Sequence, residues 1–145
     1  MGMSKECKNQ IMKSMTGKTQ YASIASNCYI GLLSAEPSYD RVENDVVYNT
    51  HELSGAGYHR MFIGGYNTTA SQVMSDIDDN GTSVNGETIF FPEAEENWGT
   101  ATHFALFNSE SGGNPHLWGA LTTAVTINEG YVPIFKPGSL SITLT

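Results

Sequence analysis

The chain has 145 residues, 39% of them apolar and 15% charged, which allows one hydrophobic core and leaves fewer charges than the roughly one quarter of an ordinary globular domain. Its formal net charge is −8, and four of its five lysines lie within the first 18 residues, so the lack of a basic stripe argues against nucleic-acid binding. No apolar run approaches the ~18 residues that span a bilayer, which argues against a membrane protein.

The first 18 residues are predicted to form a short amphipathic helix. Ser4 is placed to cap its start, and Gly17 is placed to end it in a left-handed conformation. Because an isolated helix of this length is marginal in water, it must pack on another surface. We favour the body of the same domain over a neighbouring subunit. The apolar positions that recur on one helix face are Met3, Cys7, Ile11 and Met15, with Met12 beside them.

The N-terminal segment and the cysteines bear on the compartment. The run KECKNQIMKSM is polar throughout and lacks the apolar core of a signal peptide. Cys7 and Cys28 are too few for a disulfide scaffold, so we expect two buried free thiols. We therefore expect the protein to be made in a reducing cytoplasm.

From Asn27 onward, the chain reads as short strands separated by Gly, Asn and Pro turn signals. The last segment shows this clearly, because Leu140, Ile142 and Leu144 alternate with polar residues, as in a half-buried strand. A polar stretch that includes Asp40 and 43–45 follows the first strand. The predicted strands lie within residues 28–34, 52–66, 89–91, 102–108, 116–127, 132–135 and 139–145.

This pattern predicts a mainly β protein with an antiparallel β-sandwich, either jelly-roll-like or immunoglobulin-like, after the short N-terminal helix. We expect residues 1–145 to form a single domain, with the helix in residues 1–18 and the β body in residues 27–145. We find no internal repeat, linker or low-complexity tail in the sequence.

One acidic segment, DIDDNGTSVNGE, fits the template of a calcium-binding loop. However, an EF-hand needs a helix on each side, and the residues after this loop, from Thr88 to Pro92, read as a strand. We therefore favour a solvated acidic hairpin loop and keep calcium as the alternative cofactor; no other cofactor is indicated. The candidate calcium ligands are Asp76, Asp78, Asn80 and Glu87, with Gly81 at the turn position.

We find no catalytic constellation in the sequence. The four histidines form neither H-x-x-x-H nor H-E-x-x-H, so no zinc signature is present. No G-x-S-x-G elbow surrounds a serine, and Cys28 lies in an apolar run where a thiol is normally inert. The sequence therefore predicts a protein that is not an enzyme.

The segment from Glu96 to Thr123 is predicted to form a hairpin with a turn of about six residues. On its first strand, Phe104 and Leu106 share one face, and His103 lies on the opposite face. We interpret His103 as a hydrogen-bonded strand residue because no acid or nucleophile accompanies it in the sequence. The packing anchors predicted to flank the hairpin are Trp98 and Trp118.

Aromatic side chains offer an alternative function, because they can form a sugar-binding surface as well as a β core. A receptor- or glycan-binding module would use them to contact a sugar. We treat this as the second hypothesis. The aromatic residues concerned are Tyr58, Phe62, Tyr66, Trp98 and Trp118.

The ordered combination of several segments resembles a family of small tailed-bacteriophage virion proteins, of the tail-fibre, head-fibre or minor structural type. The segments are YIGLLSAEP, ELSGAGYHRM, NGETIFFPEAEENWGTATHFALFN, SGGNPHLWGALTT and FKPGSLSITL. The likeness is weakest in residues 40–50 and 66–85, and the calcium-like loop departs from the family pattern. The matching positions are Ile30 to Pro37, Ser54 to Tyr58, Phe91, Pro92, Ala94, Trp98, Gly99, Thr102, His103, Gly112 to Asn114 and Trp118 to Thr122.

This resemblance implies a non-enzymatic virion component with a β-sandwich body. Such a protein would assemble with copies of itself, as a dimer or trimer, and with other virion proteins on the capsid, neck or tail. It would be assembled in the cytoplasm of the host bacterium and end in the virion. The resemblance leaves its position on the particle open.

Overall fold

The computed structural model describes residues 2–18, 27–42, 45–65 and 72–143. Tyr66, Leu144 and Thr145, which we predicted to belong to strands, lie outside the described residues. In chain order the elements are β1 (Gly2–Met3), α1 (Lys5–Met15), β2 (Asn27–Leu33), β3 (Ser38–Val42), β4 (Asp45–Asn49), β5 (Met61–Gly65), β6 (Thr82–Val84), β7 (Ile89–Phe90), β8 (Gly99–Phe107), β9 (Leu117–Ile127), β10 (Ile134–Phe135) and β11 (Ser141–Thr143).

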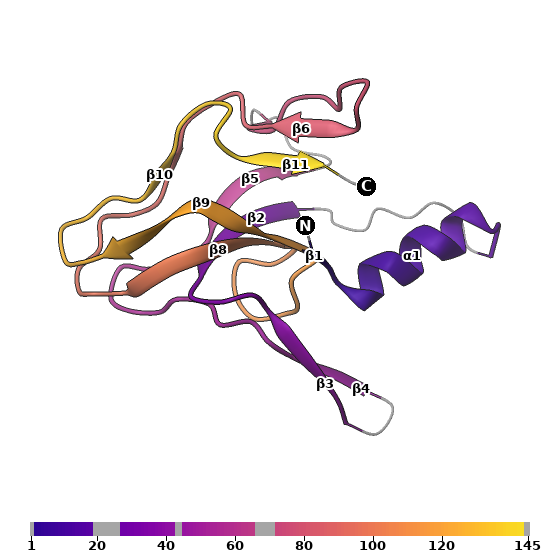
Figure 1. The fold of residues 1–145 in the computed structure, drawn as a ribbon, viewed down its shortest axis with the longest axis horizontal. Coiled ribbons are helices and arrows are strands. Elements are labelled where there is room, and N and C mark those ends of the chain that lie inside the picture. The colour runs from indigo at the N-terminus through magenta and orange to yellow at the C-terminus, as the bar shows by residue number, and fades with distance from the viewer. Residues whose placement is uncertain (1, 19–26, 43–44, 66–71, 144–145) are drawn as a thin grey trace.

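The centre of the molecule is a five-stranded antiparallel sheet with the order β1-β9-β8-β2-β5 (Figure 1). β8 lies in the middle, between β2 and β9. In this register Leu32 of β2 lies opposite Phe104, and Trp118 of β9 lies opposite Ala105. The prediction of a mainly β, antiparallel protein with a short N-terminal helix is confirmed.

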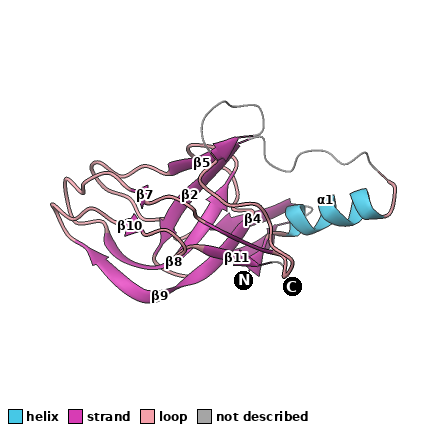
Figure 2. Cartoon of the chain, turned by 90° about the horizontal axis from the view of Figure 1, so that it is seen from above, coloured by secondary structure: helices cyan, strands magenta, loops and turns pink. Residues whose placement is uncertain are grey.

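Two small ribbons, β7–β10 and β6–β11, cover one face of this sheet, which gives a sandwich-like arrangement (Figure 2). The larger core cluster lies between the sheet and the ribbons. It joins Ile30 and Phe104 of the sheet to Ile89, Phe91 and Leu140 from the ribbon side. Burial of this apolar surface is the main favourable contribution to folding of the sandwich.

The opposite face of the sheet is also apolar near β8, where Tyr48 packs against a smaller cluster. Successive side chains of a strand point to opposite faces, so Phe104 enters the larger cluster and Ala105 the smaller one. β8 is thus buried on both faces over its second half, which explains its nearly unbroken apolar run. The members of the smaller cluster are Leu33, Ala105, Phe107 and Trp118.

Local capping sets both ends of α1. The Cys7 N–H donates to Ser4 Oγ at 3.2 Å, and Gly17 adopts a φ of 70° just beyond the helix. Only residues that tolerate the left-handed region end a helix in this way without strain, which accounts for the glycine. Both predicted cap residues therefore lie where the sequence pattern put them.

The second half of α1 extends away from the sheet (Figure 1). Tyr48 anchors the first turn, because its hydroxyl accepts from the Lys5 N–H at 3.1 Å and donates to Glu6 Oε2 at 2.9 Å. In contrast, the Met12 and Met15 side chains are 57% and 77% exposed. The helix therefore packs on the body of the domain at its first turn, as we favoured, whereas Met12 and Met15 in its second half do not.

The polar stretch after β2 forms a hairpin that the sequence pattern did not predict. β3 and β4 pair with each other and protrude from the sheet (Figure 1). β1 and β6 were missed as well, because each is short and pairs with a strand far away in the sequence, β9 and β11 respectively. Within the described part of the chain, no helix has both the length and the apolar character to cross a membrane.

Candidate functional site

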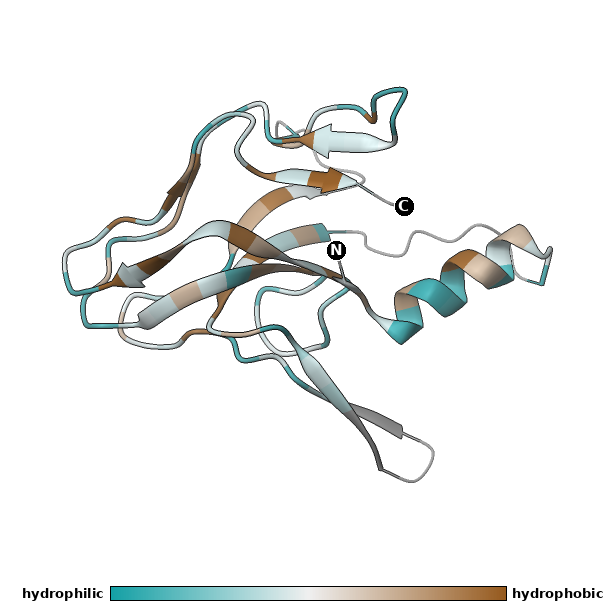
Figure 3. Cartoon of the chain, viewed as in Figure 1, coloured by the Kyte–Doolittle hydropathy of each residue, from teal (hydrophilic) through white to brown (hydrophobic). Residues whose placement is uncertain are grey.

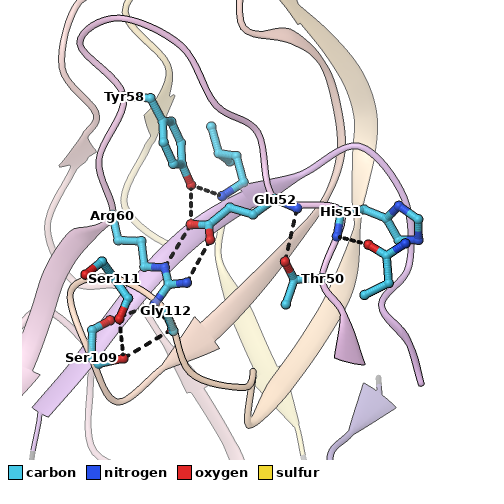
Figure 4. Close-up of polar contacts among 10 residues, drawn as sticks. Thr50, His51, Glu52, Tyr58, Arg60, Ser109, Ser111 and Gly112 are labelled. Carbon is cyan, nitrogen blue, oxygen red and sulfur yellow. Dashed lines mark hydrogen bonds and ion pairs between the residues drawn. The ribbon is translucent and has the colours of Figure 1, made fainter. Parts of the chain in front are cut away.

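Glu52 and Arg60 form an ion pair between β4 and β5 (Figure 4). Arg60 Nε donates to Glu52 Oε1 at 2.8 Å, and Arg60 Nη2 donates to Glu52 Oε2 at 2.7 Å. The intervening chain turns back on itself at Gly57, whose φ of 84° favours glycine. A Cβ atom there would also come within 3.0 Å of the Glu93 carbonyl oxygen, so the turn leaves no room for a side chain.

Arg60 also binds the loop between β8 and β9. Its Nη1 donates to the carbonyl oxygens of Ser109 and Gly112, each at 2.9 Å, and its guanidinium carbon lies 3.4 Å from the centre of the Phe107 ring. The residue is only 5% exposed. A buried cation is tolerated only when it is paired and hydrogen-bonded, and these contacts provide both. Arg60 therefore fastens the β8–β9 loop to the sheet.

Tyr58 completes this cluster. Its hydroxyl donates to Glu52 Oε1 at 2.8 Å and accepts from the Leu32 N–H at 3.1 Å. Burial, together with the negative charge of Glu52, raises the pKa of Tyr58, so the phenol stays protonated at neutral pH. A hollow of about 400 Å³ lies beside the cluster. Glu52 thus binds both Arg60 and Tyr58, and the cluster positions the chain segments that carry them.

The two tryptophans lie on opposite sides of the hairpin. Trp98 is 5% exposed and belongs to the larger core cluster, where its Nε1 donates to the Ala56 carbonyl oxygen at 2.9 Å. Trp118 is 7% exposed and belongs to the smaller cluster, where its Nε1 donates to Glu36 Oε1 at 3.2 Å. The structure therefore does not bring the two indoles together as one surface platform.

The remaining residues predicted for the hairpin lie within β8. Phe104 and Leu106 are buried in the larger cluster. His103 is half-buried, and its Nδ1 lies 2.8 Å from the Thr102 hydroxyl, which donates to the Ser34 carbonyl oxygen at 2.8 Å. The hydroxyl hydrogen is used in that bond, so Nδ1–H of His103 is the donor to Thr102. This hydrogen bond fixes the orientation of the imidazole.

The calcium-like loop folds around one of its own carboxylates. Asp78 Oδ1 accepts the backbone N–H groups of Asn80 and Thr82, both at 2.9 Å. The chain then enters β6, and Glu87 follows after the end of this strand at Val84. In the segments that the structure describes, no group of three or more His, Cys, Asp or Glu side chains is placed to hold a metal ion. Asp76 is therefore not part of such a group.

A residue within the same template, Asn85, has a role that the sequence pattern did not reveal. It is 1% exposed, and its Nδ2 donates to the carbonyl oxygens of Glu87 and Lys136, both at 2.9 Å. Its Oδ1 accepts the Leu140 N–H at 2.9 Å. Asn85 thereby holds the connection between β10 and β11 against the end of β6. Its only signal in the sequence is the Asn-Gly turn dipeptide, which does not reveal such long-range bonds.

Among the described residues, exposed large apolar side chains gather in two regions, the second half of α1 and the β7–β10 ribbon with the turn before β10, while Tyr39 and Ile77 are exposed singly elsewhere. Figure 3 colours the backbone by hydropathy and shows apolar positions in both of these segments. An apolar groove of about 370 Å³ opens beside β10, between that ribbon and β9. Exposed apolar surface of this kind often marks a contact with another molecule. In the second region the exposed residues are Phe90, Tyr131, Val132 and Ile134.

One known protein family matches almost the whole chain. The family described as Podophage GP4 fiber I protein gp80 (Gp80) matches residues 2–143. No curated protein matches the chain. The match includes α1, the complete five-stranded sheet and the segment with Glu52 and Arg60. The chain therefore belongs to the Gp80 family of podophage fibre proteins.

Proposed function

We propose that this protein is a non-enzymatic structural subunit of a phage fibre, which assembles with copies of itself and attaches to the capsid or tail of the particle. The observation that carries this proposal is the family match over residues 2–143. The exposed apolar surfaces on α1 and on the β7–β10 ribbon support it, because assembly would cover them.

The environment of the candidate reactive groups supports a role without catalysis. Burial raises the pKa of Cys28 to about 11, so its thiol is protonated and unreactive at neutral pH. The His103 ring is bound to Thr102, and Glu52 is bound to Arg60 and Tyr58. These groups stabilise the fold, and none of them forms a nucleophile with an adjacent base.

Cryo-electron microscopy of the phage particle that encodes this chain tests the proposal. We expect density for the sheet and α1 in a fibre, at several symmetry-related copies, with contacts to a capsid or tail protein. Mass spectrometry of the same washed particles should detect the chain. Its absence from intact particles would contradict a role in the virion.

A receptor- or glycan-binding module at a fibre tip is the second candidate. Trp98 and Trp118 are buried, whereas the exposed aromatic side chains of the described residues are Tyr39, Phe90 and Tyr131, at 56%, 59% and 43%. Binding of the folded protein to host cells or to a glycan array, lost on Tyr39→Ala or Tyr131→Ala with unchanged melting, would favour this function. If the folded protein binds neither host cells nor any glycan, this second function is excluded and the structural role in the fibre is the one that stands.

A further inference from the structure

We propose that α1 of one copy docks into the apolar groove between β9 and the β7–β10 ribbon of a second copy. This inference rests on the proposed function, since it assigns the contact by which fibre subunits meet. Each copy would contribute one helix and one groove. A closed ring or a reciprocal pair would then cover every helix and groove.

The helix side of the contact is formed by Ile11, Met12 and Met15. These positions fall within about 100° of one another around a helix axis, so they make one apolar strip. Ile11 is half-buried, whereas Met12 and Met15 are 57% and 77% exposed within their own chain. Methionine side chains are flexible and adapt to irregular apolar hollows, as a docking strip requires.

The groove side has a matching character. Phe104, Leu121 and Phe135 line it, together with Tyr131 and Ile134, which are each 43% exposed and therefore lie toward its mouth. The hydroxyl residues in its lining are Thr122, Thr123, Ser139 and Ser141. Its volume of about 370 Å³ is suited to a few apolar side chains from an amphipathic helix. No element among the described residues covers this mouth.

The positions of the two surfaces point to a second copy as the occupant. α1 lies at one end of the long axis, and the turn that joins β9 to β10 lies at the other end (Figures 1 and 2). Tyr48 holds the first turn of α1 beside the sheet at its own end. The helix therefore cannot reach the groove of its own chain without leaving this anchor.

Charge is distributed so that this contact is attractive. Residues 1–18 contain four lysines and one glutamate, a charge of +3, whereas the other residues contain three cations and fourteen carboxylates, a charge of −11. Glu93 and Glu129 line a neighbouring hollow, which is joined to the mouth of the groove because the Ala94 N–H donates to the Tyr131 carbonyl oxygen at 2.9 Å. Among the described residues, neither glutamate and none of the lysines of α1 forms an ion pair.

The same charges disfavour pairing of α1 with α1 of another copy. Two segments of charge +3 repel each other, and a helix of 11 residues is too short for the three to four heptads of a stable coiled coil. Docking on the acidic body of a second copy brings opposite charges together instead.

Sedimentation velocity on the full chain and two variants tests the contact. The helix variant is Met12→Glu/Met15→Glu, and the groove variant is Ile134→Lys. All three substituted side chains are exposed, so both variants should keep the wild-type far-UV circular dichroism and melting temperature. We expect wild-type self-association to weaken roughly tenfold or more in each variant, because a large apolar side chain is lost from the contact.

Mixing the two variants gives the decisive result. The groove variant retains an intact helix and the helix variant an intact groove, so we expect a one-to-one heterodimer that does not grow further. Folded variants that self-associate as the wild type does would overturn the docking contact but leave a fibre subunit with another interface. A wild type that stays monomeric at high micromolar concentration would also overturn the contact, whereas the fibre role itself is tested on the phage particle.

Two matched double variants measure the electrostatic contribution to self-association. Glu93→Lys/Glu129→Lys should weaken self-association and reduce its dependence on salt, since interactions between exposed charges are screened. Asp79→Lys/Glu110→Lys changes the net charge by the same amount away from the groove and should have a smaller effect. Equal effects of the two pairs would assign the attraction to net charge and overturn the specific contact.

Discussion

Arg60 and Glu52 meet through two parallel hydrogen bonds of 2.8 and 2.7 Å, although both side chains lie largely inside the protein. The same guanidinium binds Ser109 and Gly112 of the β8–β9 loop. One arginine thus joins the turn before β5 to the hairpin that forms the middle of the sheet. This pair is the principal electrostatic contact of the described body.

Removing one partner of this pair should be costly. We expect Arg60→Met to lower the free energy of unfolding by about 3–5 kcal/mol, because Glu52 would remain buried without its counter-charge. Arg60→Lys keeps the charge but not the planar fork, so it should recover only part of the loss. Urea denaturation measures the free energy of unfolding of both variants. A loss within the 1 kcal/mol or so typical of exposed ion pairs would contradict this account.

The buried amide of Asn85 provides a second prediction. Asn85→Ala leaves the Leu140 N–H without its acceptor and removes the amide donor shared by the carbonyl oxygens of Glu87, Phe135 and Lys136. A buried polar group left unpaired costs about 1–3 kcal/mol. Asn85→Asp should destabilise as much or more, because a carboxylate oxygen would face those carbonyl oxygens. Thermal melting measures the effect, with the exposed Asn114→Asp as control. Similar melting temperatures for Asn85→Asp and the control would refute the role of this amide.

Trp118 should matter for stability rather than for ligand recognition. Trp118→Ala empties a site in the smaller core cluster and should cost about 3–5 kcal/mol. Trp118→Phe keeps most of the packing and loses the bond to Glu36, which should cost about 1 kcal/mol. Chemical denaturation and virion incorporation measure the two effects. Unchanged melting together with lost ligand binding would overturn this interpretation.

His116 makes stability depend on pH. Burial lowers its pKa below the ordinary value of 6.5, against the opposing effect of Glu6, and its Nε2 has no hydrogen-bond partner among the residues that the structure describes. The unfolded chain therefore binds a proton at this histidine more readily than the folded chain. Its contribution to stability is fully present above about pH 6.5 and is lost as the pH falls below that value.

Replacement of His116 tests this pH dependence. His116→Leu should flatten the decrease in unfolding free energy between pH 7 and pH 5.5, measured by urea denaturation at several pH values. His59→Gln, a change in an exposed histidine, controls for the loss of one imidazole. A His116→Leu variant with the wild-type slope would show that another group causes the pH dependence.

Features that depend on nearby residues were predictable from the sequence. The cap at Ser4 and the end of the helix at Gly17 follow from hydrogen bonds and backbone freedom within one turn. β8 and β9 were predicted because their apolar runs are long and separated by Gly-rich turn residues. In contrast, the pairing of β6 with β11 joins segments about 60 residues apart, and neither segment shows it alone.

The sequence by itself determined the strand-rich class, the antiparallel β8–β9 hairpin and the ends of α1, because these depend on local propensity and on the period of apolar residues. Only the tertiary structure decided that Arg60 pairs with Glu52, that Asn85 joins β6 to the β10–β11 connection, and that Trp98 and Trp118 belong to separate clusters. It also left Met12 and Met15 exposed at one end and the groove beside β10 open at the other. These relationships depend on the distance between side chains after folding, which a linear pattern does not contain.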